Sequence, residues 1–317
     1  MVILIVETAA LARAPTTGQS KQMTIEQTRL TPVFGAEIGG VDLSRPLNDA
    51  TFDAIAQAAA EHAVLLFRDQ RLSDQQQVDF TERFGPLEVP LPRDQYGGVH
   101  GQVTRLSNVG DGDKLLAADD EHATYMKGNQ LWHIDSSFKP VPAMYSILSG
   151  REVPLEGGET EFADARAAYD AWPDETDGIA KADLDNCICE HSIVYSRSLI
   201  VGDIFSDDEK RAMPPVRQKL IRTHPVTGRK SFYVGSHASH ILGWDIDKSR
   251  ALLRRINEWC VQDRFVYSHK WRAGDLVIWD NRSVMHRGKP WNPRHRRVMH
   301  RTTVSDVDAG VTEVQVA

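Results

Sequence analysis

Short apolar segments, each bounded by glycine, proline or polar turn residues, recur along most of this chain and restrict the folds it can adopt. We expect strands over 34–43 (a pair around Gly39-Gly40), 64–67, 103–108, 145–148, 158–162, 220–224, 231–234, 265–269, 276–279 and 298–304. No Gly-x-Gly-x-x-Gly follows a strand, which argues against a dinucleotide-binding fold. The pattern favours a mainly β fold, an antiparallel sandwich or barrel with flanking helices, over a doubly wound sheet.

Fewer segments carry helical signals, in which an N-cap residue precedes apolar residues at helical spacing. The predicted helices cover 51–62 with Asn48 or Asp49 as the cap, 75–84 after Ser73-Asp74, 164–172, a segment that ends at Met213, and 247–260. The polar segment 174–185 is expected to be mainly helix or an insertion. We see no internal repeat and no apolar run of membrane-spanning length in the sequence.

The 317 residues are expected to form one domain over 29–305, after a loose extension over 1–28 and before a tail over 306–317. Mainly β chains of this length often fold as one unit. The 41% hydrophobic and 26% charged residues are ordinary for a globular protein with a sizeable core. The apolar run over 2–6 lacks a preceding positive charge and is too short for a signal peptide.

Net charge and cysteine content narrow the partners and the compartment. The formal charge of -7 and the pI near 5.9 argue against a nucleic-acid or anionic-membrane partner. The three cysteines, Cys187, Cys189 and Cys260, give neither a disulfide framework nor a zinc-finger spacing. We therefore expect a cytoplasmic protein.

The segment 129–135, Asn-Gln-Leu-Trp-His-Ile-Asp, contains the one His-x-Asp of the chain, His133 and Asp135. If this segment is a β-strand, both side chains project from one face and could bind one metal ion. His286 is the best candidate for a third ligand. With 12 histidines, about one such pattern arises by chance, so an exposed strand histidine near a turn aspartate remains an alternative.

Other polar residues follow these candidates at spacings that matter below. Thr160 follows Asp135 by 25 residues (160 − 135), and Arg297 and Arg301 follow His286 by 11 and 15 (297 − 286 and 301 − 286). Because side chains alternate along a strand, the two arginines would share one strand face.

Several longer runs together carry a resemblance to a known family. They are Asn129-Gln-Leu-Trp-His-Ile-Asp-Ser-Ser-Phe138, Gly157-Gly-Glu-Thr-Glu-Phe162, Ala167-Ala-Tyr-Asp170, Met213-Pro-Pro215, Gly235-Ser-His-Ala-Ser-His240 and Gly274-Asp-Leu-Val-Ile-Trp-Asp-Asn281. The chain resembles, over about 30–305, the taurine dioxygenase family of iron(II)- and 2-oxoglutarate-dependent oxygenases. The resemblance is strongest to the branch that acts on phenoxyacetates. It implies a double-stranded β-helix, the jelly-roll core of cupin-like proteins, and suggests a homo-oligomer.

The resemblance also implies roles for the residues. His133, Asp135 and His286 would bind Fe(II) as two histidines and a carboxylate, which leaves coordination positions for 2-oxoglutarate and O₂. Arg297 and Thr160 match the positions that bind the other carboxylate of 2-oxoglutarate, and a guanidinium suits a carboxylate because it can bind it through two parallel hydrogen bonds. The products would be succinate, CO₂ and a hydroxylated substrate.

For the substrate, the resemblance implies a small anionic molecule, an aryloxyalkanoate such as 2,4-dichlorophenoxyacetate, whose hydroxylated ether would release a phenol. The residues that match substrate positions are Arg301, Asn129, Arg93 and His224. We interpret the basic residues between 282 and 301 as a positively charged region that attracts two anions, 2-oxoglutarate and the substrate. We interpret His237 and His240 as hydrogen-bonded scaffold residues.

Three alternatives stay open at this point. One is a dioxygenase for taurine or another alkylsulfonate, which Pro90 and Arg93 make less favourable because that enzyme has a histidine and a tyrosine there. A second is a non-catalytic cupin-like metal binder. A third is a zinc hydrolase that uses two histidines and an aspartate.

Overall fold

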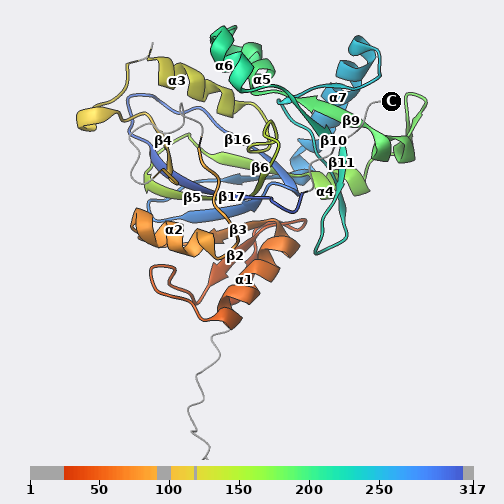
Figure 1. Ribbon diagram of the computed structural model, residues 1–317. Helices are drawn as coiled ribbons and strands as arrows, with labels where there is room; N and C mark the ends of the chain where they lie inside the picture. Colours follow the sequence, from red (N-terminus) through yellow and green to blue (C-terminus); the bar gives the residue numbers. More distant parts are fainter. Residues whose placement is uncertain (1–24, 91–100, 118–119, 310–317) are drawn as a thin grey trace, which may run out of the picture.

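The structure, a computed structural model, describes residues 25–90, 101–117 and 120–309. Its largest sheet has seven strands in the order β1-β2-β3-β15-β5-β17-β4 (Figure 1). Neighbouring strands are antiparallel except β2 and β3, which are parallel. Their bounds are β1 Glu26–Arg29, β2 Ala36–Gly39, β3 Val64–Phe67, β4 Thr104–Ser107, β5 Ala143–Glu152, β15 Leu276–Asp280 and β17 Val298–Ser305.

A smaller antiparallel sheet lies against one face of the large sheet. Its order is β14-β6-β16, with bounds β14 Val266–His269, β6 Thr160–Asp164 and β16 Val284–Gly288. Because side chains alternate along each strand, apolar residues of both sheets meet between them. This inter-sheet core includes Leu66, Leu148, Phe162, Val277, Trp279, Val284 and Met299. The predicted mainly β fold with flanking helices is therefore confirmed.

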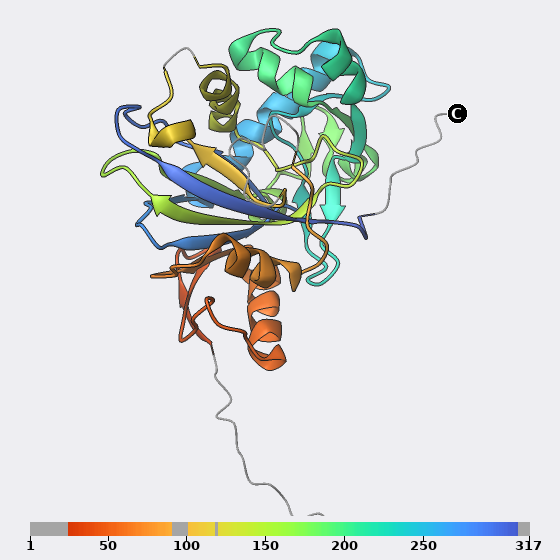
Figure 2. The ribbon, with the colours of Figure 1, turned by 60° about the vertical axis from the view of Figure 1, so that its left-hand side comes forward.

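Helices α1 (Asp49–His62) and α2 (Asp74–Glu82) cover the other face of the large sheet (Figure 2). Asn48 caps α1 by accepting from Thr51 N, and Ser73 forms a capping box with Gln76 at the start of α2. The apolar side chains that these helices share with the sheet form a core of their own. Both helices were predicted from these cap residues.

A third group of elements packs beyond the small sheet. It consists of α4 (Ala165–Asp170), α7 (Ile246–Cys260), the sheet β10-β9-β13 (β10 Val216–Lys219, β9 Ile188–His191, β13 Ala238–Ile241) and the pair β11 Ile221–Thr223 with β12 Lys230–Phe232. The apolar stripe of α7, which includes Leu252, Leu253 and Ile256, faces this group, as its helical spacing predicts.

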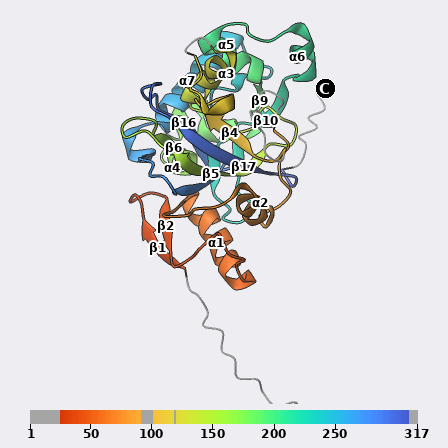
Figure 3. The same ribbon diagram turned by 90° about the vertical axis from the view of Figure 1, so that its left-hand side faces the viewer.

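Short helices cover the molecule on the side away from α1 and α2 (Figures 1 and 3). They are α3 Glu121–Met126, the 3₁₀ turn η3 Lys127–Gln130, α5 Ile193–Val201 and α6 Asp207–Ala212. Tyr125, Ile193 and Phe205 form a small apolar cluster among them. The remaining elements are η2 Asp111–Asp113, β7 Glu175–Thr176, β8 Ile179–Ala180, η4 Lys181–Asn186 and η5 Asp263–Phe265.

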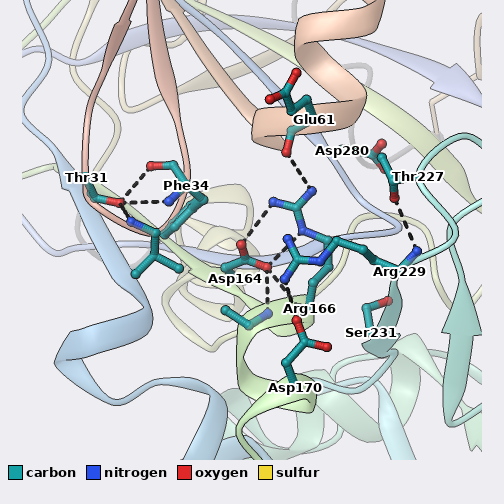
Figure 4. A network of polar contacts seen from close by, with 12 residues as sticks. Thr31, Phe34, Glu61, Asp164, Arg166, Asp170, Thr227, Arg229, Ser231 and Asp280 are labelled. Atoms are coloured by element: carbon teal, nitrogen blue, oxygen red, sulfur yellow. Dashed lines mark hydrogen bonds and ion pairs between the residues drawn. The ribbon is translucent and has the colours of Figure 1, made fainter.

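A buried ion pair joins two of these layers (Figure 4). The carboxylate of Asp164 caps α4 and accepts from Arg166 Nε and Nη2, each at 3.0 Å. Arg166 Nη1 donates to the carbonyls of Ala60 and Glu61 at the end of α1. Since Arg166 is almost fully buried, these partners satisfy a cation that would otherwise be costly to bury.

Some local predictions were wrong. The strand pair lies not within 34–43 but between β1 and β2, because the turn falls before Gly35, whose carbonyl accepts from Leu30 N. As a result β1 begins inside the predicted loose extension, of which residues 1–24 lie outside the described residues. Much of 174–185 is not α-helix, since Asp177 and Gly178 both adopt positive φ in a tight turn between β7 and β8.

Among the residues that the structure describes, none of the helices is both long enough and apolar enough to cross a membrane.

Candidate active site

Two histidines from distant parts of the chain face each other across a backbone bridge. His133 N donates to His286 O and His286 N donates to His133 O, both at 2.9 Å, and the ring centroids lie 4.2 Å apart. His286 belongs to β16, but His133 forms only an isolated bridge, so the strand expected over 129–135 was wrong. A turn follows instead, in which Ser136 adopts a φ of 51°.

That turn brings Asp135 to both rings. Its Oδ1 lies 3.8 Å from His133 Nε2, and its Oδ2 lies 3.6 Å from His286 Nε2. One ligand atom from each of the three buried residues lies within 4.8 Å of the other two. In the part of the chain that the structure describes, this is the one cluster of three or more such ligands. The structure therefore brings together the three residues that the sequence predicts as metal ligands.

Neighbouring polar groups hold the cluster in place. Ser146 of β5 donates to Asp135 Oδ2 at 2.7 Å and accepts from Asn281 Nδ2 at 3.0 Å. Asn281 also accepts from Asp135 N at 3.2 Å. His133 Nδ1 lies 2.7 Å from the carbonyl of Leu131, which favours the tautomer that leaves Nε2 with a lone pair towards the cluster.

The cluster has the protonation state that a metal ion needs. Burial lowers the pKa of His133 and lowers the pKa of His286 well below its ordinary value. Burial alone would raise the pKa of Asp135, but Arg301 and the two histidines hold that pKa below its ordinary range. Two neutral imidazoles and one carboxylate fit a divalent first-row metal ion and can occupy three positions of an octahedral site.

A cavity of about 640 Å³ adjoins the cluster. His286, Thr160, Arg297 and Arg301 lie on its wall together with an apolar group. That apolar group comprises Leu106, Leu115, Leu116, Ala117, Ala123, Met126 and Trp291. The volume is within the range of cavities that bind small molecules, and one region is polar while the other is apolar.

Arg297 carries an unpaired charge on the wall of this cavity. Its side chain is 7% exposed, and within the described residues it has no carboxylate partner. Nη2 donates to Gly158 O at 3.2 Å, Nε has no acceptor, and the guanidinium lies 5.0 Å from the ring centroid of Trp291. Burial lowers the pKa of Arg297 to about 10, which still leaves a cation at neutral pH. An anion in the cavity would supply the missing partner.

Thr160 is the first residue of β6 and lies opposite Gly288 of β16. Its hydroxyl accepts from Trp271 Nε1 at 2.9 Å, and the residue is buried. Because the indole supplies the donor, the hydroxyl proton is left to donate towards the cavity. Thr160 and Arg297 therefore lie in one cavity, as the sequence predicts.

Arg301 and Asn129 line both this cavity and a smaller one. Arg301 Nη1 donates to Asp135 Oδ1 at 2.6 Å. It is on β17, and Arg297 directly precedes that strand on the same face as Met299, as alternation predicts. Asn129 lies in η3 rather than in a strand.

The smaller cavity, about 30 Å³, has His133 and Asp135 on its wall. Two of its buried residues, Arg197 and His237, were not predicted to line the site. Arg197 comes from α5, a helix that was not predicted, whereas His237 lies in the Gly235–His240 motif and was interpreted as scaffold. The nearness of His237 to the ligand His133, with ring centroids 6.0 Å apart, is visible only in three dimensions.

The structure does not bring His224 to either cavity. Its Nε2 lies 2.9 Å from Asp280 Oδ2, and its Nδ1 accepts from the backbone of Val226 and Thr227. Both ring nitrogens are therefore used in joining the β11–β12 hairpin to the end of β15. Arg93 lies outside the described residues. His240 contacts Ser239 and Glu190 and lines neither cavity.

Most of the basic residues between 282 and 301 have acidic partners. Arg282 pairs with Asp280, Arg287 and Lys289 pair with Glu161, and Arg296 pairs with Glu152 and Asp113. Most of the run is therefore charge-paired, and the cations on the wall of the large cavity are Lys127, Lys289, Arg294, Arg297 and Arg301.

Two histidines and a carboxylate beside a cavity between two β-sheets define a class of protein, the non-haem metal oxygenases that use Fe(II). Comparison with known proteins identifies the family. Residues 26–303 match the family described as taurine catabolism dioxygenase TauD, TfdA family, and the chain belongs to that family.

Characterised relatives in this family cover nearly all of the chain. The 2,4-dichlorophenoxyacetate dioxygenase of Cupriavidus pinatubonensis is 39% identical over 90% of this chain and 99% of the relative. The (S)-phenoxypropionate dioxygenase of Delftia acidovorans is 37% identical over 88% and 94%. Both names include α-ketoglutarate, which is 2-oxoglutarate.

Solved structures agree with this assignment. AAD-2 in complex with Mn(II) and N-oxalylglycine has a TM-score of 0.82 and 43% identity, covering 90% of this chain and 98% of that one. The chain is thus a 2-oxoglutarate-dependent dioxygenase, an enzyme class that uses Fe(II), 2-oxoglutarate and O₂.

Proposed function

We propose that this dioxygenase hydroxylates an aryloxyalkanoate, such as 2,4-dichlorophenoxyacetate, next to its ether oxygen. The observation that carries the proposal is the composition of the large cavity, whose wall combines the metal ligands His133 and His286, the cation Arg301 and apolar side chains. An aryloxyalkanoate has matching parts, since an apolar ring and an anionic group flank the reacting carbon. The relatives named for phenoxyacetate and phenoxypropionate support the same choice.

His133, Asp135 and His286 would hold Fe(II), and Ser146 and Asn281 would keep Asp135 oriented towards it. When bound, Fe(II) with 2-oxoglutarate and O₂ supplies the oxidant that hydroxylates a C–H bond, with succinate and CO₂ as products. Hydroxylation of the carbon next to an ether oxygen gives a hemiacetal. Its collapse breaks the ether bond and releases a phenol and an oxoacid.

The distal carboxylate of 2-oxoglutarate fits the guanidinium of Arg297 and the hydroxyl of Thr160. Arg297 is a buried cation without a carboxylate partner among the described residues, and the Thr160 hydroxyl already accepts from Trp271 and so can donate. Gly158 keeps room for this arginine, because a Cβ there would lie 3.1 Å from Arg297 Nε. These contacts would fix the co-substrate so that its keto-acid end reaches the metal.

For the organic substrate, we retain Arg301 and Asn129 as residues that face it, since both line the two cavities beside the metal cluster. Arg93 stays a prediction from the sequence. His224 is not retained, because both its ring nitrogens are engaged in structural bonds.

We also propose that the two facing sheets form a double-stranded β-helix, with residues 29–305 as one domain. The inter-sheet core and the structural neighbours support this. Four further points remain predictions from the sequence: a cytoplasmic location, a homo-oligomer, the absence of nucleic-acid and membrane partners, and a tail over 306–317.

A substrate panel tests the proposal. Purified enzyme with Fe(II), ascorbate, 2-oxoglutarate and air would be offered aryloxyacetates, aryloxypropionates of both hands, phenylalkanoates and alkylsulfonates. We expect succinate and phenol in equal amounts with at least one aryloxyalkanoate. Preference for taurine or another sulfonate would overturn the substrate assignment and leave the reaction class intact.

A further inference from the structure

Arg197 is a second buried arginine beside the metal cluster, and the proposed binding of Fe(II) and 2-oxoglutarate gives it no role. It projects from α5 onto the wall of the small cavity, together with His133 and Asp135, and is 5% exposed. Within the described residues it has no carboxylate partner, and its Nε and Nη1 have no acceptor. Because an unpaired buried cation is costly, a bound anion beside Arg197 would stabilise it.

The surroundings of Arg197 hold the guanidinium in one place. Nη2 donates to Asn129 Oδ1 at 3.1 Å, and the guanidinium lies 4.7 Å from the ring centroid of Tyr125. It also lies against the backbone of Gly128, where the Cβ of any other residue would overlap it. One short segment, 125–129, therefore supplies an aromatic ring, an open space and an acceptor, and two guanidinium nitrogens of Arg197 have no acceptor among the described residues.

Arg297 has the same arrangement in the large cavity. It too is buried, has no carboxylate partner among the described residues, lies beside an aromatic ring (Trp291) and packs against a glycine (Gly158). The two cavities meet at Leu106, Asn129, His133 and Arg301. Each cavity thus has on its wall one buried arginine that lacks a carboxylate partner among the described residues, and the metal ligand His133 lines both cavities.

We propose that Arg197 binds the anionic group of the organic substrate, which deepens and rests on the function proposed above. The small cavity, about 30 Å³, has room for about two water molecules, which is enough for a carboxylate but too little for an aromatic ring. The ring would then extend into the large cavity towards Leu115 and Met126. Arg301 also lines both cavities, but it donates to Asp135, so Arg197 adds a second cation for the acid group.

The test compares an acid with its neutral analogue. Calorimetry would measure binding of 2,4-dichlorophenoxyacetate and of 2,4-dichlorophenoxyacetamide to the protein loaded with Mn(II) and N-oxalylglycine. We expect Arg197→Gln to weaken binding of the acid about 10- to 100-fold, since hydrogen bonds to charged groups are worth that factor. Binding of the amide should change less than about threefold, because a neutral group gains little from the charge.

Two further variants and one check of folding make the result specific to the charge of Arg197. Arg197→Lys keeps the charge but loses the planar pair of donors, and should restore part of the acid's affinity. Arg250→Gln is the matched control, because Arg250 also lies over a tyrosine, Tyr195 of α5, but lines neither cavity. Circular dichroism and thermal unfolding of Arg197→Gln verify that the variant folds.

Equal loss for acid and amide, or no loss for the acid, would overturn the proposal and leave Arg197 a structural residue. The binding assay also separates this proposal from the proposed function. The wild-type protein could bind a different acid, such as an alkylsulfonate or a phenylalkanoate, and no aryloxyalkanoate. If Arg197→Gln then loses binding of that acid, the proposed aryloxyalkanoate substrate is wrong, but the proposed role of Arg197 is supported. If the wild type binds none of the acids, both fail.

Discussion

Arg301 Nη1 lies 2.6 Å from Asp135 Oδ1, so a cation of the substrate cavities is bonded directly to the carboxylate of the metal cluster. The same carboxylate accepts from Ser146 and lies between two neutral histidines. Without a metal ion, Arg301 is the main source of charge compensation for Asp135. A divalent ion would supply that compensation instead.

This relationship predicts how stability responds to metal in an Arg301→Gln variant. Removing one partner of a buried ion pair costs about 3 to 5 kcal/mol in the metal-free protein. Mn(II) should recover much of that loss, so the metal-induced rise in the free energy of unfolding should be larger in the variant than in the wild type. Denaturant unfolding with and without Mn(II) measures this. Arg287→Gln, which removes a half-exposed partner of Glu161, is the control and should show the wild-type response.

Ser146 is predicted to support metal binding through Asp135. Ser146→Ala removes a hydrogen bond to a ligand carboxylate and should weaken metal binding about 10-fold or more. Ser149→Ala is the matched control, because Ser149 lies on the opposite face of β5 and donates to Gln77 instead. Competition with a fluorescent chelator gives both affinities. Equal affinities for the two variants would show that the bond to Ser146 does not orient the ligand.

We predict that Arg297 lowers the stability of the ligand-free protein and is kept because it binds the co-substrate. Arg297→Met replaces a buried unpaired cation with an apolar side chain and should stabilise the ligand-free protein by about 1 to 3 kcal/mol. The same change should abolish the stabilisation that N-oxalylglycine gives the wild type in the presence of Mn(II). Thermal unfolding with and without the analogue measures both effects. A destabilised variant that still responds to N-oxalylglycine would contradict the assignment.

The burial of His191 predicts that the free energy of unfolding decreases in acid. It is fully buried, and burial lowers its pKa to about 3, so it is neutral in the fold but takes up a proton on unfolding below about pH 6.5. The unfolded state thus binds more protons between these values, and stability falls as pH falls from 6.5 to 3, by up to about 1.4 kcal/mol per pH unit. His191→Phe keeps the stacking on Tyr233 and should flatten this slope. An unchanged slope would mean that His191 is already charged in the fold.

The helix starts and the alternation of side chains along strands were largely readable from the sequence because they depend on local signals. Asn48 and Ser73 start α1 and α2 as their side chains predict, and alternation correctly assigns Arg297, Met299 and Arg301 to one face. The metal cluster was predicted from the His-x-Asp pattern together with the family resemblance. The backbone conformation around His133 was not predicted, because the bridge between His133 and His286 joins segments that are far apart in sequence.

The substrate side of the site was the least predictable part. His224 has a motif position but points its ring at Asp280, and only packing reveals this. Arg197 lies in a helix without a clear amphipathic pattern, so nothing local indicated that its guanidinium would reach Asn129, 68 residues earlier. Such contacts depend on how distant helices pack, which periodicity does not report.

The central claim is that this enzyme couples oxidation of 2-oxoglutarate to cleavage of an aryl ether. The most direct measurement is the ratio of 2,4-dichlorophenol to succinate formed from 2,4-dichlorophenoxyacetate, with Fe(II), 2-oxoglutarate or O₂ omitted in turn. We predict a ratio near one in the complete mixture and no phenol in any of the three omissions. Phenol formed without 2-oxoglutarate or without O₂, or succinate formed at the substrate-free rate with no phenol, would contradict the account.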